Sequence, residues 1–385
     1  MHVNPEQKRA IETIKGRVLV LAGAGSGKTS VLVQRCVNLL TNHRVPPTAI
    51  LGLTFTNKAA EEMRSRITKF VNSTVAKEVY LSTFHSFCFW VLKQEIHHLG
   101  YTQSFTVYDD KDRERLLQTL EKQLKQESES ESIDQNLLLT EMIKSLKAYN
   151  AVDFDGLLTL TLELFQKFPA LLEKYQDRFR YIMIDEYQDT NQIQFQLADL
   201  LSRKYGNLFV VGDDDQSIYS WRGAEVKHIL NFNHHAIVKL EQNYRSTSTI
   251  LNAANAVIKN NKERHSKTLW TNTFEGDKIH LFHAFSETEE AEAVVARILR
   301  LKKEKNLSWG DFAILYRSNN LSRPFEIALM QAPYKEGDKF LRGIPYRVVQ
   351  GTEFYERAEI KDILAYLKVI VNSLDHTPLL RILNY

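Results

Sequence analysis

The stretch VLVLAGAGSGKT, from Val18 to Thr29, decides the fold of this chain. Four apolar residues, typical of a buried strand, run directly into a loop of small residues, and Gly-Lys-Thr then opens a segment with helical periodicity. Small residues let the backbone curl so that several N–H groups point at one anion, and the following helix directs its positive N-terminal end at the same point. The stretch therefore predicts a phosphate-binding loop between a strand and a helix.

The loop also predicts a nucleotide and a magnesium ion as ligands. Lys28 can reach the β- and γ-phosphates, and the Thr29 hydroxyl can bind Mg²⁺. The usual pattern begins with glycine, whereas this chain has Ala22 there. A glycine-rich turn without a ligand would leave Gly-Lys-Thr at the helix start unexplained. The predicted contacts come from Ala22, Gly23, Ala24, Gly25, Ser26, Gly27, Lys28 and Thr29.

A pair of acids supplies the second half of this predicted site. Asp185 and Glu186 follow the apolar run Tyr181–Ile184. Asp185 can hold Mg²⁺ through water, and Glu186 can act as a general base on the attacking water. An Asp-Glu pair after a strand is usually a solvated turn, but its combination with the phosphate loop favours the catalytic interpretation.

Short apolar runs alternate with longer helical segments along the chain. This pattern predicts an α/β fold with a parallel sheet covered by helices. The first six predicted strands are Val18–Leu21, Ile50–Phe55, Val79–Thr83, Tyr181–Ile184, Leu208–Val211 and Ile237–Leu240.

Two regions depart from this rhythm. Residues 89–176 show helical patterns without strand runs, which predicts a helical insertion in the first domain. After Asn243 a second strand–helix series predicts a further α/β domain, with an inserted surface loop at 331–343. Its predicted strands are Ile279–Phe282, Phe312–Tyr316 and Tyr346–Val349.

The composition of the chain limits its number of domains, its class of protein and its compartment. A chain of 385 residues suits two or three domains, and its 43% hydrophobic and 25% charged residues are typical of soluble globular proteins. No apolar run approaches the ~20 residues that span a membrane, and the polar N-terminus lacks a signal-peptide core. Cys36 and Cys88 have no metal-ligand spacing and fit the core of a cytoplasmic protein. The net charge of +3 neither requires nor excludes a nucleic-acid partner.

Residues 211–224 read VGDDDQSIYSWRGA and place an amide close to aromatic side chains. Gln216 can sense a phosphate, while Tyr219 and Trp221 can stack on nucleic-acid bases beside Arg222. Aromatic residues near a strand end are more often part of the core, so this segment alone leaves both interpretations open. With the phosphate site, the pattern predicts a segment that couples nucleotide state to DNA.

Five motifs occur in a specific order: NPEQ at 4–7, TFTNKAA at 54–60, TFHSF at 83–87, DEYQDTN at 185–191 and LEQNYRS at 240–246. Together with the phosphate loop and residues 211–224, they resemble the UvrD/Rep family of superfamily 1 DNA helicases over nearly the whole chain. The resemblance implies that the fold is RecA-like and that the nucleotide is ATP.

The resemblance also implies roles for single residues. Gln7 would read the adenine edge, Tyr244 would stack near the base, and Arg245 and Gln216 would contact the γ-phosphate. The implied path of single-stranded DNA is lined by Phe55, His85, Phe154, Tyr219, Trp221, Arg222 and Asn319. Phe55 at a strand end can instead belong to the core, and His85 can instead cap a helix or make a buried hydrogen bond. The family usually has Phe-Asp-Asp where this chain has Phe154, Asp155 and Gly156, so Gly156 is a departure.

The family further implies domain boundaries and an activity. Residues 1–88 and 177–242 would form domain 1A, residues 89–176 insertion 1B, and residues 243–385 part of domain 2A. The implied activity is an ATP-dependent helicase or translocase that moves 3′ to 5′ on single-stranded DNA and acts at single-strand/duplex junctions in replication or repair.

Two later family motifs, one with a second arginine for the γ-phosphate, are not found in this sequence. We therefore expect a fragment, a truncated product or one half of a split protein. The alternative to an autonomous helicase is a weakly catalytic, ATP-gated DNA-binding module that needs a second polypeptide.

Overall fold

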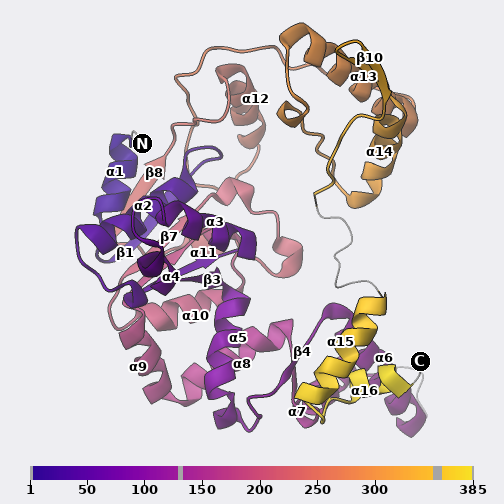
Figure 1. The fold of residues 1–385 in the computed structure, drawn as a ribbon. Coiled ribbons are helices and arrows are strands. Elements are labelled where there is room, and N and C mark those ends of the chain that lie inside the picture. Colours follow the sequence, from indigo (N-terminus) through magenta and orange to yellow (C-terminus); the bar gives the residue numbers. More distant parts are fainter. Residues whose placement is uncertain (1–2, 129–132, 350–357, 384–385) are drawn as a thin grey trace. The chain divides into compact units, whose positions relative to one another are not determined.

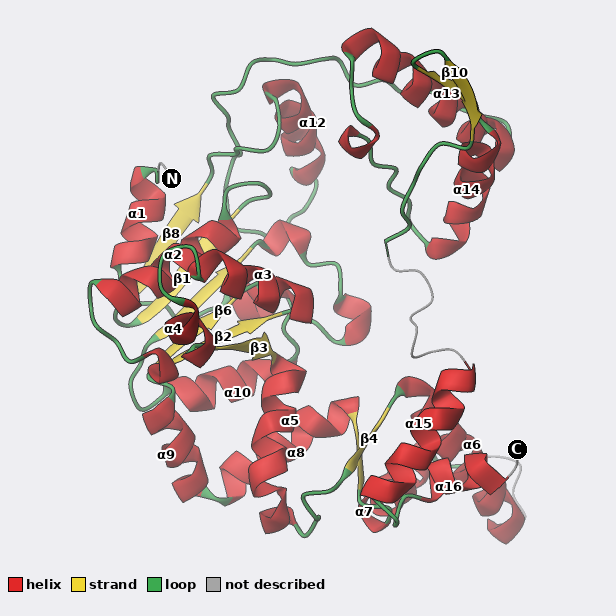
Figure 2. Ribbon diagram, viewed as in Figure 1, coloured by secondary structure: helices red, strands yellow, loops and turns green. Residues whose placement is uncertain are grey.

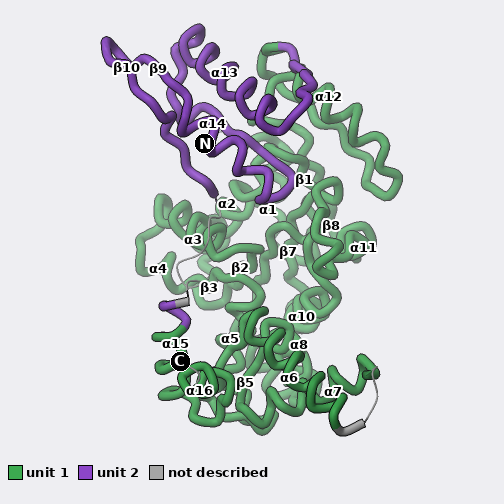
Figure 3. Tube along the Cα trace, turned by 90° about the vertical axis from the view of Figure 1, so that its right-hand side faces the viewer, with its two compact units in different colours: residues 1–277, 362–385 green, residues 278–361 purple. Residues whose placement is uncertain are grey.

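The computed structural model describes residues 3–128, 133–349 and 358–383. The chain forms two compact units, residues 1–277 with 362–385, and residues 278–361 (Figure 3). No helix in the described part of the chain has the length and apolar character needed to cross a membrane.

A six-stranded, wholly parallel sheet forms the centre of the first unit (Figure 1). The strand order is β3-β2-β6-β7-β1-β8. All six predicted strands are confirmed. Their bounds are β1 (Arg17–Ala22), β2 (Ile50–Thr54), β3 (Tyr80–Thr83), β6 (Tyr181–Ile184), β7 (Leu208–Gly212) and β8 (Ala236–Leu240).

Helices cover both faces of this sheet (Figure 2). Leu19 and Leu21 of β1 face one layer, whereas Val18 and Val20 of the same strand face the other. This alternation buries the interior strands β2, β6, β7 and β1 on both sides and explains their continuous apolar runs, whereas the edge strands β3 and β8 are only partly buried. One layer contains α1 (Pro5–Glu12), α2 (Lys28–Thr41), α3 (Asn57–Ile67) and α4 (Ser73–Glu78). The other contains α5 (Phe84–Glu95), α8 (Phe154–Lys167), α9 (Pro169–Arg178) and α10 (Gln192–Ser202).

The parallel arrangement determines where the polar motifs meet. The carboxyl ends of all six strands lie along one edge of the sheet, and each predicted nucleotide or DNA motif of this unit except 4–7 and Phe154 follows one of them. Ligands of open α/β sheets bind outside this edge. The α/β class and the phosphate loop at its centre are therefore confirmed.

The insertion is mainly helical, with α6 (Asp110–Ser128) and α7 (Gln135–Ala148). The prediction that it lacks strands is wrong, because β4 (Thr106–Tyr108) and β5 (Ala151–Asp153) pair in parallel. Three-residue strands are too short to produce a recognisable alternation in the sequence.

The last helices, α15 (Ala358–Val371) and α16 (His376–Leu383), pack against this insertion. Asp375 is fully buried and accepts hydrogen bonds from the hydroxyls of Thr106, at 2.6 Å, and Tyr108, at 2.5 Å. The Asn372 amide donates to the carbonyl of Asn150 at 3.0 Å. Two distant parts of the sequence thus share one buried polar network. The boundaries of 1A, 1B and 2A remain predictions.

The second unit contains α13 (Glu287–Lys305), α14 (Ser322–Gln331) and a hairpin of β9 (Pro333–Glu336) and β10 (Lys339–Arg342). The hairpin replaces the predicted surface loop at 331–343. The strands predicted at 279–282, 312–316 and 346–349 are wrong, because none of these segments pairs with a strand among the residues that the structure describes. Leu281 and Leu315 are 94% and 92% exposed. Apolar runs alone do not make a strand when no partner lies beside them.

Candidate nucleotide and DNA site

The phosphate loop has the backbone that its glycines predict. Gly25 and Gly27 adopt left-handed φ angles of +69° and +87°. A side chain at Gly25 would also place its Cβ 2.6 Å from the Asn243 amide nitrogen. Gly27 precedes α2 and provides no side-chain cap, so the first N–H groups of the helix can bind an anion. These features fit a phosphate group.

Lys28, at the start of α2, meets the acids that follow β6. Its ammonium lies 2.7 Å from Glu186 Oε2, and both side chains are partly buried. Asp185 is 8% exposed, and its backbone N–H donates to the Leu53 carbonyl at 2.9 Å. Glu186 adopts a left-handed φ of +49°, which a residue with a side chain rarely adopts without a local reason. The structure thus brings Lys28, Asp185 and Glu186 together as predicted.

The carboxyl of Asp185 is strongly perturbed. Burial and the neighbouring charge of Glu186 raise its pKa to about 7, against the opposing effect of Lys28. In the unfolded chain the pKa of an aspartate is about 3.9. Between these values the folded protein binds more protons than the unfolded chain, so its stability falls as the pH rises from about 4 to about 7.

Because the pKa of Asp185 is raised, we expect Asp185→Asn to change how the free energy of unfolding depends on pH. Without divalent metal, the variant should be about 2–4 kcal/mol more stable than the parent above pH 7, because it no longer buries a charge. The two proteins should differ less near pH 4. Urea unfolding across this range, in the presence of a chelator, measures the difference. Parallel stability profiles would show that Asp185 does not titrate as described.

Gln7 and Tyr244 lie at the predicted adenine side of the loop. Gln7 is 7% exposed, and its amide donates to the Ser26 carbonyl at 2.9 Å. Asn4 caps α1 and donates to the Tyr244 hydroxyl at 3.0 Å. The ring of Tyr244 remains 52% exposed. The amide and the ring are therefore held beside the phosphate loop, and their contacts with a nucleotide base remain predictions.

Asn243, for which the sequence predicts no role, connects the segment after β8 to the same loop. Its amide donates to the Ala24 carbonyl at 2.6 Å, and its oxygen accepts from the backbone N–H of Arg245 at 2.8 Å. The Tyr244 N–H donates to the Gly25 carbonyl at 3.0 Å. Arg245 is exposed beside Gly25. A polar residue inside the LEQNYRS motif was the available signal for this contact.

Gln188 links the acids to the segment that follows β7. It is 1% exposed, and its amide nitrogen donates to Glu186 Oε2 at 2.9 Å. Its amide oxygen accepts from the Asp213 N–H at 3.0 Å. The Gln216 side chain donates to the Asp213 carboxylate. A continuous polar chain therefore runs from Lys28 to Gln216.

An exposed aromatic group includes Tyr219, which follows Gln216 by three residues. Phe55 and Tyr219 stack with ring centroids 4.8 Å apart, and Tyr219 lies 6.4 Å from Trp221. Phe55 is 40% and Trp221 is 71% exposed, so neither belongs to the buried core. The Arg222 guanidinium lies 4.6 Å from the Trp221 ring centroid.

His85 and Phe154 form a second aromatic contact. Their rings meet edge to face at 5.9 Å and bring the insertion to the end of β3. Burial lowers the pKa of His85, against the opposing effect of Asp155. A Cβ at Gly156 would lie 2.6 Å from the Asp153 carboxylate that caps α8, which accounts for glycine there. Asn319 is exposed within the second compact unit.

Comparison with known proteins agrees with this arrangement. The model of the UvrD/REP helicase N-terminal domain matches residues 3–148 and 122–237, and that of the UvrD-like helicase C-terminal domain matches residues 238–385. The chain is 41% identical over 417 residues to the ATP-dependent DNA helicases PcrA of Staphylococcus aureus (strain Mu50) and Staphylococcus epidermidis (strain RP62A). All of this chain but only 56% of each relative is covered, so the chain spans about half the length of these curated relatives. With family models matching more than half of its residues, the chain belongs to the UvrD/REP helicase family.

Proposed function

We propose that this chain is the ATP-dependent motor part of a DNA helicase that moves 3′ to 5′ on single-stranded DNA in replication or repair. The observation that carries the proposal is the polar chain from Lys28 through Glu186, Gln188 and Asp213 to Gln216, which lies three residues before Tyr219 of the exposed Phe55–Tyr219 stack. It joins a phosphate site to rings that can hold bases.

The nucleotide site is proposed to bind Mg-ATP, whose γ-phosphoryl transfer to water supplies the free energy for movement. Lys28 and the N-terminal end of α2 bind the phosphates, and Thr29 and Asp185 hold the metal. Glu186 accepts the proton of the attacking water, while Arg245 and Gln216 contact the γ-phosphate. Gln7 and Tyr244 orient the base.

The Lys28–Glu186 ion pair gives this site a direct way to respond to its ligand. In the structure the ammonium and the carboxylate neutralise each other at 2.7 Å. A bound phosphate competes for Lys28 and leaves Glu186 with Gln188 as its remaining partner. The change is then passed through Gln188 to Asp213 and Gln216, in the same segment as Tyr219 and Trp221.

The DNA side relies on stacking, which grips every base equally and suits a motor that moves along a sequence. Phe55, Tyr219 and Trp221 supply the rings, with Arg222 beside them. His85 and Phe154 extend this surface to the insertion, and Asn319 of the second unit is proposed as a separate DNA contact.

Trp221→Ala should lower the affinity for single-stranded DNA by about 1–3 kcal/mol if the ring stacks on a base. Fluorescence anisotropy with a labelled oligonucleotide measures the change. Phe274→Ala is a matched control, because Phe274 is 75% exposed but lies outside the aromatic group. Equal affinities of the Trp221 variant and the parent would remove Trp221 from the DNA surface.

A second candidate function is an ATP-gated DNA-binding module without effective turnover, completed by another polypeptide. It is favoured by the second unit, where the described residues contain a hairpin but no parallel strands. DNA-stimulated phosphate release by the 385-residue chain separates the two candidates. Robust release supports the motor, whereas binding without release supports the module.

A further inference from the structure

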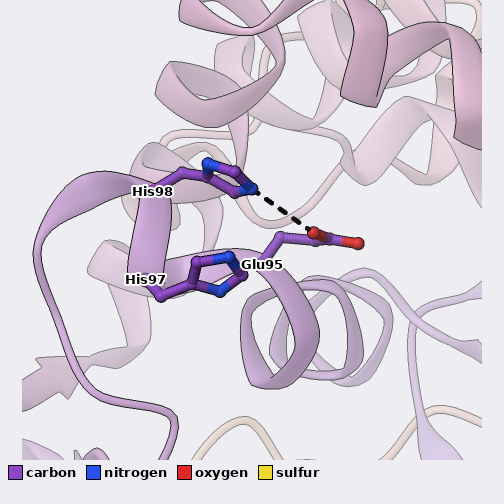
Figure 4. Close-up of side chains that lie close together, drawn as sticks. All are labelled: Glu95, His97 and His98. Carbon is purple, nitrogen blue, oxygen red and sulfur yellow. Dashed lines mark ion pairs between the residues drawn. The ribbon is translucent and has the colours of Figure 1, made fainter.

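Two histidines and a buried glutamate converge at the end of α5, away from the motifs discussed above. Glu95 is the last residue of α5, and His97 and His98 lie in the following 3-10 turn, Ile96–Leu99 (Figure 4). One donor atom from each of the three side chains lies within 4.8 Å of the other two. These residue types are the nitrogen and oxygen ligands that Zn²⁺ and related divalent metals bind.

The Glu95 carboxylate is held in place from the protein side. Glu95 is 5% exposed, and its Oε1 accepts from Lys174 Nζ at 2.6 Å and from the Tyr175 hydroxyl at 3.2 Å. Its Oε2 is directed toward His98 Nε2 at 3.8 Å, which is too long for a hydrogen bond (Figure 4). One oxygen is therefore anchored, and the other remains able to bind a ligand.

The imidazole rings are also positioned by their neighbours. The centroids of His97 and His98 lie 4.2 Å apart, and the His98 ring packs 5.1 Å from that of Phe168. Both histidines are exposed, so an ion from solvent can reach them. The exposed rings can also turn by the small amount that closing around an ion needs.

We propose that Glu95, His97 and His98 form a binding site for Zn²⁺ or a similar first-row divalent metal. Bonds of about 2.0–2.2 Å place tetrahedral ligands about 3.4 Å apart, which is close to the 3.8 Å between Glu95 Oε2 and His98 Nε2. Water completes the fourth position, because the chain provides three ligands. Lys174 and Tyr175 act on the opposite oxygen and orient the carboxylate.

A second group of potential metal ligands among the described residues differs from the Glu95 site in its ion pairs. Asp213, Asp214 and Asp215 also lie close together, but Lys267 pairs with all three, and Arg264 pairs with Asp215 at 2.7 Å. Their charge is already neutralised by protein cations. Glu95 is paired with a protein cation only through Oε1, which lies 2.6 Å from Lys174 Nζ, and its Oε2 lies beside two imidazole rings.

The site can be tested with the tag-free chain and Zn²⁺ in calorimetric titration. We expect one saturable site per chain, which His97→Asn and His98→Asn each weaken at least about tenfold. His43→Asn is the matched control, because His43 is exposed but outside the cluster. Circular dichroism checks that both variants fold. We mutate the histidines because they are exposed, whereas a change at the buried Glu95 could disturb folding.

A second measurement uses Co²⁺, whose visible absorption is intense when its ligands are tetrahedral. The parent and His43→Asn should give this absorption, and the His98 variant should lose it. The proposal is overturned if no saturable site exists, or if the His97 and His98 variants bind Zn²⁺ as the parent does. The cluster would then be a histidine pair at a helix end with an ion-paired glutamate.

Discussion

Lys28→Ala should lower nucleotide affinity by at least about two orders of magnitude while the protein stays folded. The Lys28 side chain follows the predicted phosphate loop, is 11% exposed and pairs with Glu186. Each charge-assisted hydrogen bond that it makes to phosphate is worth about 1.5–3 kcal/mol, so the loss of two such bonds accounts for the effect. Titration with a fluorescent ATP analogue measures the affinity.

The matched control is Lys167→Ala, which removes a 62% exposed lysine paired with Glu163 on α8. This variant should bind nucleotide as the parent does. If Lys28→Ala retained the parent affinity in a folded protein, the loop after β1 would not be the nucleotide site.

Glu186→Gln should lower DNA-stimulated phosphate release by about 10²–10⁴-fold, the usual contribution of a general base. Glutamine keeps the shape of the side chain and can still accept from Lys28, so nucleotide affinity should change little. Steady-state phosphate release and nucleotide titration of the same sample separate the two effects. Glu163→Gln, at a 40% exposed glutamate on α8, is the control. Unchanged release would assign the proton transfer to another group.

The sheet and the phosphate site were predictable because their signals are local in sequence. Each strand is a short apolar run that ends in a polar motif, and Val18–Thr29 contains strand, loop and helix start together. Because the strands pair in parallel, their carboxyl ends lie along one edge of the sheet, and the position of the site follows from the strand prediction.

The contacts that were not predicted join residues far apart in the chain. Asn243 reaches Ala24, and Asp375 reaches Thr106 and Tyr108. Neither asparagine nor aspartate carries a pattern that identifies so distant a partner. Only the folded structure shows which buried polar groups need these residues as hydrogen-bond partners.

In the second unit, the sequence predicts strands that the described residues do not form. Residues 279–282 and 312–316 have the apolar character of strands, yet Leu281 and Leu315 are exposed and lack a neighbouring strand. Sequence pattern reports which segments are able to enter a sheet, whereas pairing depends on what lies beside them.

We expect the polar chain through Gln188 to couple the nucleotide to the DNA surface. Such coupling is reciprocal and is typically worth about 1–3 kcal/mol, or 5- to 150-fold in affinity. It is measurable without turnover, by comparing single-stranded DNA affinity with and without a saturating non-hydrolysable ATP analogue.

The most direct test is this comparison in the parent and in Gln188→Ala. We predict that the analogue changes the DNA affinity of the parent at least about fivefold, and that Gln188→Ala binds each ligand alone but loses this dependence. A parent whose DNA affinity ignores the analogue, or a Gln188 variant that responds as the parent does, would contradict the account.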